Sequence, residues 1–210
     1  MLVLFYLWLR SMSVKPYAIG TVILSVFLSF GCMADGHDQA ASIKDGIESV
    51  YTDLGLGNCE EHVDLDDPNE STYQFCPGVV DYSLIVRRVG SGRTSIDIHT
   101  PQKGVYPLDY QEFVTRHMTQ LGARAEWRVS MEHGQNIPIA LIVSVNAHEN
   151  VEEPEQVTTS YLAIAKITPT EICVTDRLVQ DSFDHTRVRR VADMARTKPC
   201  LEPQPGMVIE

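Results

Sequence analysis

Residues 125–145, AEWRVSMEHGQNIPIALIVSV, decide the fold class that the sequence predicts. Apolar side chains alternate with polar ones over residues 125–131, which is the period of a strand with one buried face. Gly134 lies in a short polar turn that can close a hairpin. The returning run, residues 137–145, is apolar on both faces apart from Ser144. We therefore expect a central strand with protein packed on each side.

The same periodicities predict further strands and helices on either side of this hairpin. The expected elements are two arms of a first β unit at 51–56 and 71–76, a hairpin of 82–89 and 93–100, strands at 160–167 and 172–178, and helices at 109–117 and 185–196. Asp184 is placed to cap the last helix. We expect an α+β fold: an antiparallel-rich sheet domain of about seven strands with two to three helices and two disulfides.

The first 34 residues have the order of a secretory signal. Counted from Met12, a short basic segment with Lys15 precedes an apolar run, residues 17–30, and small residues around a cut after Ala34. We therefore expect translation to start at Met12 and assign residues 1–34 to the signal peptide. An uncleaved membrane anchor is the competing interpretation, because the apolar segment is just long enough to span a bilayer.

Cleavage before Cys32, with acylation of its thiol, is a further alternative. A bacterial lipoprotein signal usually has Leu three residues before the cysteine, where this chain has Ser29, so we favour cleavage after Ala34. Beyond the signal we expect a linker or short helix at 35–50, a single α+β domain at 51–200 and a loose tail at 201–210. The expected location is periplasmic or secreted, or lipid-anchored to the envelope if Cys32 is acylated.

The charge of the processed chain restricts its partners. Of 17 basic residues, Arg10 and Lys15 precede the first acid, Asp35, which leaves 15 basic residues against 28 acidic ones and a formal charge of −13. This field repels nucleic acid and anionic lipid surfaces, so we expect no nucleic-acid partner. Membrane contact is expected only through the signal or a lipid on Cys32. A protein partner attracted by long-range charge would be basic.

Four cysteines remain after cleavage at Ala34, and in an exported chain an even set indicates two disulfides. Three pairings are possible. We favour Cys59 with Cys76 and Cys173 with Cys200, because each would close a short loop between neighbouring elements. A zinc site is the alternative, but no pair has C-x-x-C spacing, so we expect no metal.

Glu126 and Arg128 are the best candidate binding residues in the sequence. They flank Trp127 in a strand, so both charged side chains lie on the face opposite the tryptophan. With Arg87 they can form a charged patch that binds a ligand or partner. The alternative is structural: the two charges pair across strands with Arg87 or Arg88 of the earlier hairpin. We favour the structural interpretation.

No motif for catalysis, cofactor binding or metal binding is present. Residues 64–70, DLDDPNE, have the acid density of a calcium loop, but Pro68, Asn69 and Phe75 stand where an EF-hand needs other residues. The H-E-x-x-H, G-x-S-x-G, P-loop and dinucleotide patterns do not occur, and the histidines lie singly in different elements. We assign no catalytic residue and expect no cofactor. A Ser, His and Asp site assembled in space stays possible in principle, with His99 as the residue to test.

Several segments together resemble a set of small, uncharacterised exported proteins of Gram-negative bacteria. The segments are residues 49–59 (SVYTDLGLGNC), Cys76-Pro-Gly, Tyr82, Glu126-Trp127-Arg128, Cys173 and an Arg/Ala-rich helix ending at Cys200. The resemblance covers most of the processed chain and implies export, two disulfides and no assigned activity. The loop at 101–106 and the acidic stretch at 149–155 match no part of it.

Three functions follow as hypotheses. We favour a non-enzymatic exported domain that binds or stabilises an unidentified protein or ligand of the cell envelope. The second hypothesis, based on the charge of the processed chain, is an inhibitor or sequestering partner of a cationic secreted enzyme such as a lysozyme. The third is a hydrolase with a spatially assembled site.

Intact mass spectrometry of the exported protein under non-reducing conditions tests this assignment. We expect the mass of residues 35–210 less four hydrogens, because the signal is removed and the four remaining cysteines are oxidised. An increment of acyl chains on a chain that begins at Cys32 would show the lipoprotein alternative instead. Recovery of the full chain with free thiols would contradict export.

Overall fold

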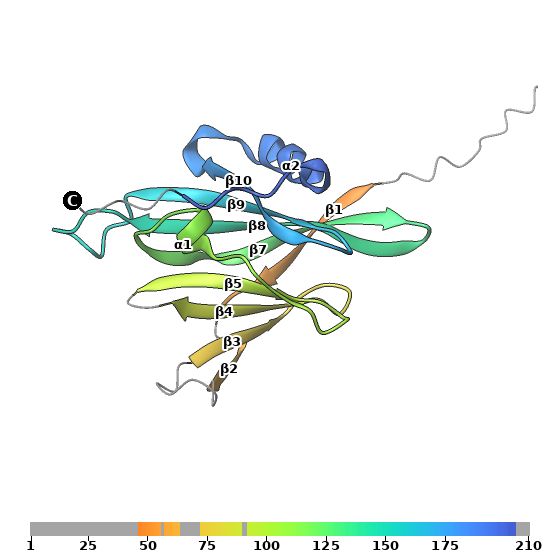
Figure 1. The fold of residues 1–210 in the computed structure, drawn as a ribbon, viewed down its shortest axis with the longest axis horizontal. Helices are drawn as coiled ribbons and strands as arrows, with labels where there is room; N and C mark the ends of the chain where they lie inside the picture. Colours follow the sequence, from red (N-terminus) through yellow and green to blue (C-terminus); the bar gives the residue numbers. More distant parts are fainter. Residues whose placement is uncertain (1–45, 56, 64–71, 90–91, 205–210) are drawn as a thin grey trace, which may run out of the picture. The chain divides into compact units, whose positions relative to one another are not determined.

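The computed structural model describes residues 46–55, 57–63, 72–89 and 92–204 (Figure 1). These belong to one compact unit, residues 43–210. The expected signal peptide with Cys32, most of the expected linker, the acidic loop at 64–70 and the last part of the tail lie outside the described residues.

The described strands form two five-stranded antiparallel sheets, seen as two layers in Figure 1. Sheet A has the order β1-β7-β8-β9-β10 and sheet B the order β2-β3-β4-β5-β6. The strands of sheet A are β1 (Ile47–Asp53), β7 (Met118–Glu132), β8 (Gln135–His148), β9 (Thr159–Ile167) and β10 (Ile172–Val179). Those of sheet B are β2 (Glu60–Val63), β3 (Thr72–Pro77), β4 (Ser83–Val89), β5 (Arg93–His99) and β6 (Val105–Pro107).

Helical structure is limited among the described residues. The α-helices are α1 (Tyr110–Phe113) and α2 (His185–Asp193), and two 3₁₀ turns, η1 (Gln180–Ser182) and η2 (Ala195–Thr197), flank α2. Asp184 caps α2 as expected, since its carboxylate accepts a hydrogen bond of 2.8 Å from the backbone N–H of Arg187.

The central hairpin is confirmed and is longer than predicted. β7 and β8 pair along almost their whole length, and β8 is the middle strand of sheet A. His133 and Gly134 form the two-residue turn, both with positive φ (51° and 77°), which is the geometry that suits the twist of a tight hairpin. The hairpin of β4 and β5 and the pair β9 and β10 also match the predicted strands.

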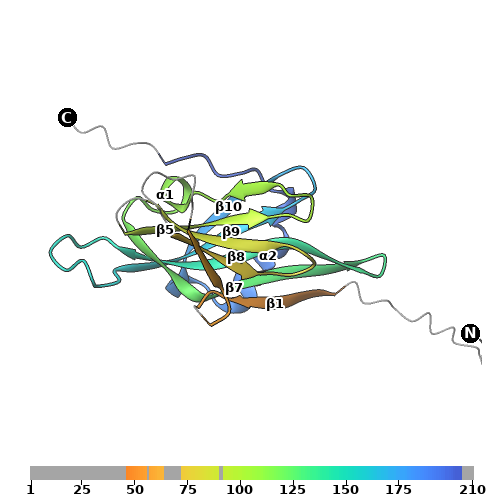
Figure 2. The ribbon, with the colours of Figure 1, turned by 90° about the horizontal axis from the view of Figure 1, so that it is seen from below.

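The main core lies between the two sheets, and Trp127 is its largest fully buried side chain. Figure 2 shows the strands of the two sheets from below. The indole N–H of Trp127 donates a hydrogen bond of 2.9 Å to the Thr52 hydroxyl on β1, and this hydroxyl donates one of 3.0 Å to the carbonyl of Pro77 on β3. The tryptophan is fully buried and meets Tyr82 edge to face. Trp127 therefore connects the sheets by packing, and Thr52, which the indole holds in place, connects them by a hydrogen bond.

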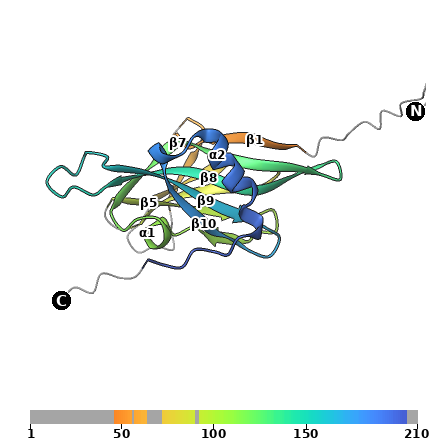
Figure 3. The same ribbon diagram turned by 90° about the horizontal axis from the view of Figure 1, so that it is seen from above.

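A second, smaller core explains why β8 is apolar on both faces. The outer face of sheet A is covered by α2, as Figure 3 shows. Val188 and Ala192 of α2 pack with Ala140 and Ile142 of β8 and Ile164 of β9. The inner face of β8 lies in the main core, so both faces of this strand are covered from Pro138 to Val143.

Both expected disulfides are present. Cys59 is bonded to Cys76 and joins the segment after β1 to β3, while Cys173 is bonded to Cys200 and joins β10 to the segment after α2. Bridges of this kind typically contribute about 2 to 4 kcal/mol to stability, mainly by restricting the unfolded chain.

The predicted fold class is wrong. The domain is mostly β, with ten strands in two sheets and α1 and α2 as its α-helices among the described residues, and not an α+β domain of about seven strands with two to three helices. The predicted arms at 51–56 and 71–76 lie in different sheets, because β1 pairs with β7 and β3 pairs with β2 and β4. β1 also begins at Ile47, inside the segment for which we expected a linker or helix.

The predicted helix at 109–117 is reduced to the single turn α1. Asp109 has a left-handed φ of 38°, and the backbone N–H of Thr115 already bonds to the carbonyl of Tyr110 in a wider turn. Tyr110 and Val114 are buried in the main core. The apolar spacing at this place reflects an irregular segment that fills the core beside β5 before the chain enters β7.

Gly78 is required by the close approach of Trp127. A Cβ at this position would lie 2.6 Å from the Tyr82 carbonyl oxygen and 2.7 Å from Cζ2 of Trp127. We expect Gly78→Ala to lower the free energy of unfolding by about 1 to 3 kcal/mol, because the backbone or the indole must shift. Urea denaturation of the oxidised protein measures this.

Gly57→Ala is the matched control, since a Cβ there meets nothing within 4 Å. It should change the free energy of unfolding by less than about 0.5 kcal/mol. Equal effects of the two substitutions would contradict the proposed role of Gly78.

Candidate functional site

Glu126 and Arg128 lie on the outer face of sheet A, beneath α2. The Arg128 guanidinium binds both carboxylate oxygens of Asp193, through Nε at 2.6 Å and Nη2 at 3.0 Å, and also bonds to Ser49. Glu126 accepts a hydrogen bond of 2.6 Å from Nε of Arg189. The Arg128 side chain is only 7% exposed. These charges hold β1, β7 and α2 together.

The third predicted binding residue, Arg87, is elsewhere. It lies on β4 in sheet B and pairs with the buried carboxylate of Asp97. The structure therefore does not bring Arg87 together with Glu126 and Arg128, and the cross-strand pairing that we expected with Arg87 or Arg88 is wrong. The partners of the Glu126 and Arg128 side chains come from α2 and β1, which are far from β7 in sequence.

The Glu126 carboxylate is held ionised by this arrangement. Burial raises its pKa, but hydrogen bonds from Arg189 and Ser49 and the charges of Arg189 and Arg128 outweigh that effect, so its pKa lies below the ordinary value. Glu126 also lines a hollow of about 280 Å³ beside α2, together with Tyr51 and Arg124. The charged groups of Glu126 and Arg128 already have partners within the protein, which supports the structural interpretation of both residues.

His99 has neighbours that could suggest hydrolysis but are not connected as a catalytic triad. It lies opposite Ser83 in the ladder of β4 and β5, and Asp97 is two residues away on the same strand. The Asp97 carboxylate is paired with Arg87, and no hydrogen bond joins the histidine to the serine or the aspartate among the described residues. Burial, the largest effect, and the charge of Arg87 lower the pKa of His99, although Asp97 opposes them. The hydrolase hypothesis stays a prediction.

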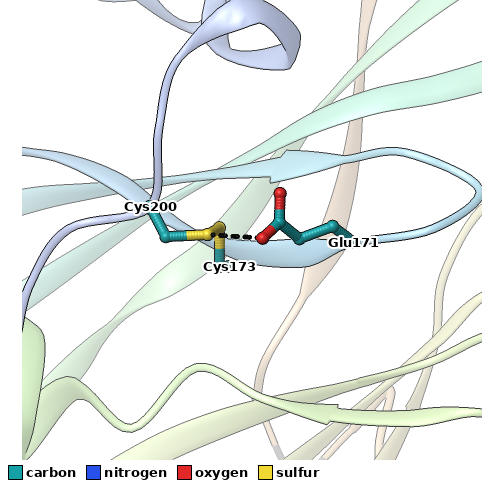
Figure 4. Close-up of side chains that lie close together, drawn as sticks. All are labelled: Glu171, Cys173 and Cys200. Carbon is teal, nitrogen blue, oxygen red and sulfur yellow. Dashed lines mark hydrogen bonds between the residues drawn. A yellow bond between two sulfur atoms is a disulfide. The ribbon is translucent and has the colours of Figure 1, made fainter.

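Glu171, Cys173 and Cys200 gather in one place, shown in Figure 4, and are the one group of potential metal ligands that the described residues bring together. Both sulfurs are in the disulfide, so neither is a thiolate that could bind a metal. Glu171 also pairs with Nζ of Lys166 at 2.5 Å. We interpret this group as a disulfide beside an ion pair.

The best candidate for a binding site is a cleft lined by both sheets, with a volume of about 480 Å³. We call it the inter-sheet cleft. Sheet B contributes polar side chains at this end, in contrast to its apolar positions at the centre of the core. The residues that line the cleft are Leu54, Gly55, Glu61, Thr72, Tyr73, Gln74, Val86, Arg88, Thr94, Gln120, Leu121, Gly122 and Ala123.

The wall that sheet A provides is formed by an irregularity in β7. The register of β7 against β8 shifts between Leu121 and Ala125, and the extra residues at this bulge line the cleft. Gly122 is needed there, because a Cβ would lie 2.8 Å from Cβ of Ser144. Bulges of this kind frequently lie beside functional sites, where they change the direction of a strand.

A second hollow, of about 300 Å³, continues from this cleft and shares Arg88, Thr94 and Gln120 with it. We call it the His148 pocket. Its lining residues are Arg88, Gly92, Arg93, Thr94, Met118, Thr119, Gln120, His148, Pro154 and Glu155. Both hollows fall at the lower end of the size range of ligand sites.

Neither the inter-sheet cleft nor the His148 pocket was predicted from the sequence. One signal was available: Arg87 and Arg88 are consecutive in a strand, so one of them must share a face with the apolar Val86. Arg88 has this position, and it lines the cleft. Nothing in the sequence indicates that His148 lies beside it.

The chain matches no family profile, no curated protein and no solved structure. The resemblance to exported proteins of Gram-negative bacteria therefore stays a prediction.

The role of Arg128 can be tested by Arg128→Met, which leaves the carboxylates of Glu126 and Asp193 without the cation between them. We expect the free energy of unfolding at pH 7 to fall by about 3 kcal/mol, as measured by urea denaturation. Arg124→Met is the control on the same strand: Arg124 is exposed and its guanidinium lies over the ring of Tyr51, so the loss should stay below about 1 kcal/mol.

The difference between wild type and Arg128→Met should depend on pH. Because the pKa of Glu126 is lower in the folded state, its carboxylate stabilises the fold above its ordinary pKa of 4.5 and this contribution is lost as pH falls through the folded pKa. The difference should therefore shrink below about pH 4.5. A difference that stays constant from pH 7 to pH 3 would contradict an electrostatic role.

Proposed function

We propose that this protein is an exported, non-enzymatic domain that binds a ligand or partner of the cell envelope in the inter-sheet cleft. The observation that supports this most directly is the state of the cleft's polar side chains. Glu61, Gln74, Arg88 and Gln120 line it. Glu61, Arg88 and Gln120 are exposed and Gln74 is half-buried, and none of the four side chains has a hydrogen bond or ion pair to another described residue. Groups that are free and directed into one hollow are available to a ligand.

Export is supported by the oxidised cysteines. The described part of the chain holds two disulfides, which persist in oxidising compartments and are rare in the cytosol. No helix among the described residues is long and apolar enough to cross a membrane. An oxidising, extracytoplasmic location is the one in which this scaffold would keep both crosslinks.

The charge of the chain favours a second candidate, an inhibitor of a cationic secreted enzyme. Residues 149–158 connect β8 to β9, and Glu152, Glu153 and Glu155 in this loop are exposed. Its tip carries Val151, which is 92% exposed, and its base is tied down by Glu149, which accepts hydrogen bonds from Thr158 and Thr159. An acidic loop held in this way could enter the site of a basic enzyme.

A pull-down from envelope extract at low salt tests the proposed function. We expect wild-type protein to retain a partner that Gln74→Trp does not retain, because the indole would fill the inter-sheet cleft. Gln102→Trp is the matched control, since Gln102 lies in an exposed turn between β5 and β6, and it should retain the partner. Circular dichroism establishes that all three proteins are folded.

Equal retention by all three proteins would overturn the role of the inter-sheet cleft. If that retention also fell steeply with added salt and was lost in the double variant Glu152→Gln, Glu153→Gln, the inhibitor would be the correct function, because screening weakens attraction between exposed charges. If the wild-type protein retained no partner, both the role of the inter-sheet cleft and the inhibitor function would be overturned.

A further inference from the structure

We propose that strand β1 is a dimerisation edge, at which a second copy of this chain adds its own β1 antiparallel, so that sheet A continues from one copy into the other. β1 is an outermost strand of sheet A, with β7 as its one neighbour among the described strands (Figure 3). An edge strand carries backbone N–H and C=O groups with which another chain can pair. This edge involves none of the residues that line the inter-sheet cleft, so the dimer goes beyond the proposed function.

The other three edges of the described sheets are each protected against such pairing. β10 is covered by the segment after α2, because the backbone N–H of Leu201 donates to the carbonyl of Val174 at 2.8 Å. β6 has three residues and ends in Pro107, and β2 has four exposed residues that begin with two glutamates. β1, in contrast, has seven residues in continuous register with β7 and contains no proline, lysine or glycine. It is the described edge best suited to pair.

The outward-facing backbone groups of β1 belong to Ser49 and Tyr51. Just beyond the strand, the N–H of Leu54 donates at 2.9 Å to the carbonyl of Ala123, which lies directly opposite it in the same register. Opposed residues of antiparallel strands alternate between hydrogen-bonded and non-bonded pairs. The even-numbered residues of β1 therefore bond to β7, and the N–H and C=O groups of Ser49 and Tyr51 point away from it. On that side no described residue binds them.

A two-fold axis at Val50 lets two copies of β1 satisfy each other. In this register Ser49 of one copy lies opposite Tyr51 of the other, and the pair exchanges both of its hydrogen bonds on each side of the axis. The side chains also fit, because the small serine lies beside the large tyrosine, which is 45% exposed. Val50, which is 40% exposed, meets Val50 of the second copy on the other face. A second copy provides this match by symmetry, which makes it the occupant of the edge.

The charges near the edge agree with this register. Glu48 lies opposite Thr52 of the second copy, so the two glutamates do not face each other. Asp53 lies opposite Ile47 of the second copy and is paired in register with Arg124 on β7. The whole chain, however, has 28 acidic and 17 basic residues, so two copies repel each other at long range. The dimer should therefore become tighter as salt screens this repulsion.

Sedimentation velocity of the exported, oxidised protein, from about 1 μM to about 1 mM, tests the proposal. We expect the mass to double as concentration rises, at a lower concentration when sodium chloride is added. Tyr51→Pro should lose the dimer, because proline removes an outward N–H and leaves the bonds to β7 intact. Tyr51→Ala is the matched control: it loses the same ring but keeps the N–H, so it should dimerise no more than about tenfold more weakly.

Val50→Lys tests the same edge if Tyr51→Pro does not fold. It places two ammonium groups opposite each other at the two-fold axis, so the dimer should be lost. Val63→Lys is the control, because Val63 is 49% exposed and lies on the edge strand β2. It should dimerise as the wild type does. A dimer that persists in Val50→Lys, or that both variants lose, would overturn the proposal.

Amide hydrogen exchange of the ¹⁵N-labelled protein locates the interface. Exchange at Ser49 and Tyr51 should slow as the dimer fills, whereas the Val50 and Thr52 amides, which bond to β7, should be protected at every concentration. A dimer that leaves exchange at Ser49 and Tyr51 unchanged would use another surface. Slow exchange there in the monomer would mean that another segment of the same chain covers β1. Either result, or a protein that stays monomeric throughout, would overturn the proposal.

Gln74→Trp separates the dimer from the proposed function. Gln74 lies on β3 in sheet B, so this variant should dimerise as the wild type does. If the dimer forms but the pull-down retains no partner, the proposed function fails and the dimer stands. If no dimer forms but a partner is retained by wild type and lost in Gln74→Trp, the dimer fails and the proposed function stands.

Discussion

The burial of Trp127 between the sheets is the constraint on which the rest of the structure depends. Its indole N–H reaches Thr52 on β1, and that hydroxyl reaches the carbonyl of Pro77 on β3, so one hydrogen-bonded chain crosses from sheet A to sheet B. Gly78 lets the backbone approach the ring, and the bond between Cys59 and Cys76 holds the strand that carries Pro77. Packing and hydrogen bonds thus connect the two sheets at this point.

On the outer face of sheet A, a network of charged side chains also holds separate elements together. Arg128 lies between acids from β7 and α2, and its removal from water is offset by a two-point contact with Asp193. Apolar packing of α2 on β8 would hold the helix without fixing its direction. The ion pairs with Glu126 and Asp193 hold one side of the helix close to β7 and β1. Charges that suggest a binding patch in the sequence thus orient a helix in the fold.

The inter-sheet cleft and the His148 pocket lie where the apolar packing between the sheets gives way to polar side chains. Toward the hairpin between β4 and β5, the inner face of sheet B carries polar side chains. On the opposite wall, the bulge in β7 interrupts the regular pairing of β7 with β8. Glu61, Arg88 and Gln120 are exposed there and have no partner among the described residues, so they can contact a ligand without losing a bond within the protein.

The sequence by itself determined much of the local structure, although not the single turn α1 or the start of β1. It indicated the hairpins, the central position of β8, the Asp184 cap and the disulfide pairs, because alternation, turn residues and short loops act over a few residues. Only the tertiary structure decided that the strands divide into two sheets, that Arg128 pairs with Asp193, and that Arg88 and His148 share a pocket. Period-two alternation shows that a face is buried but not what buries it, and contacts between residues some 60 positions apart leave no trace in the local pattern.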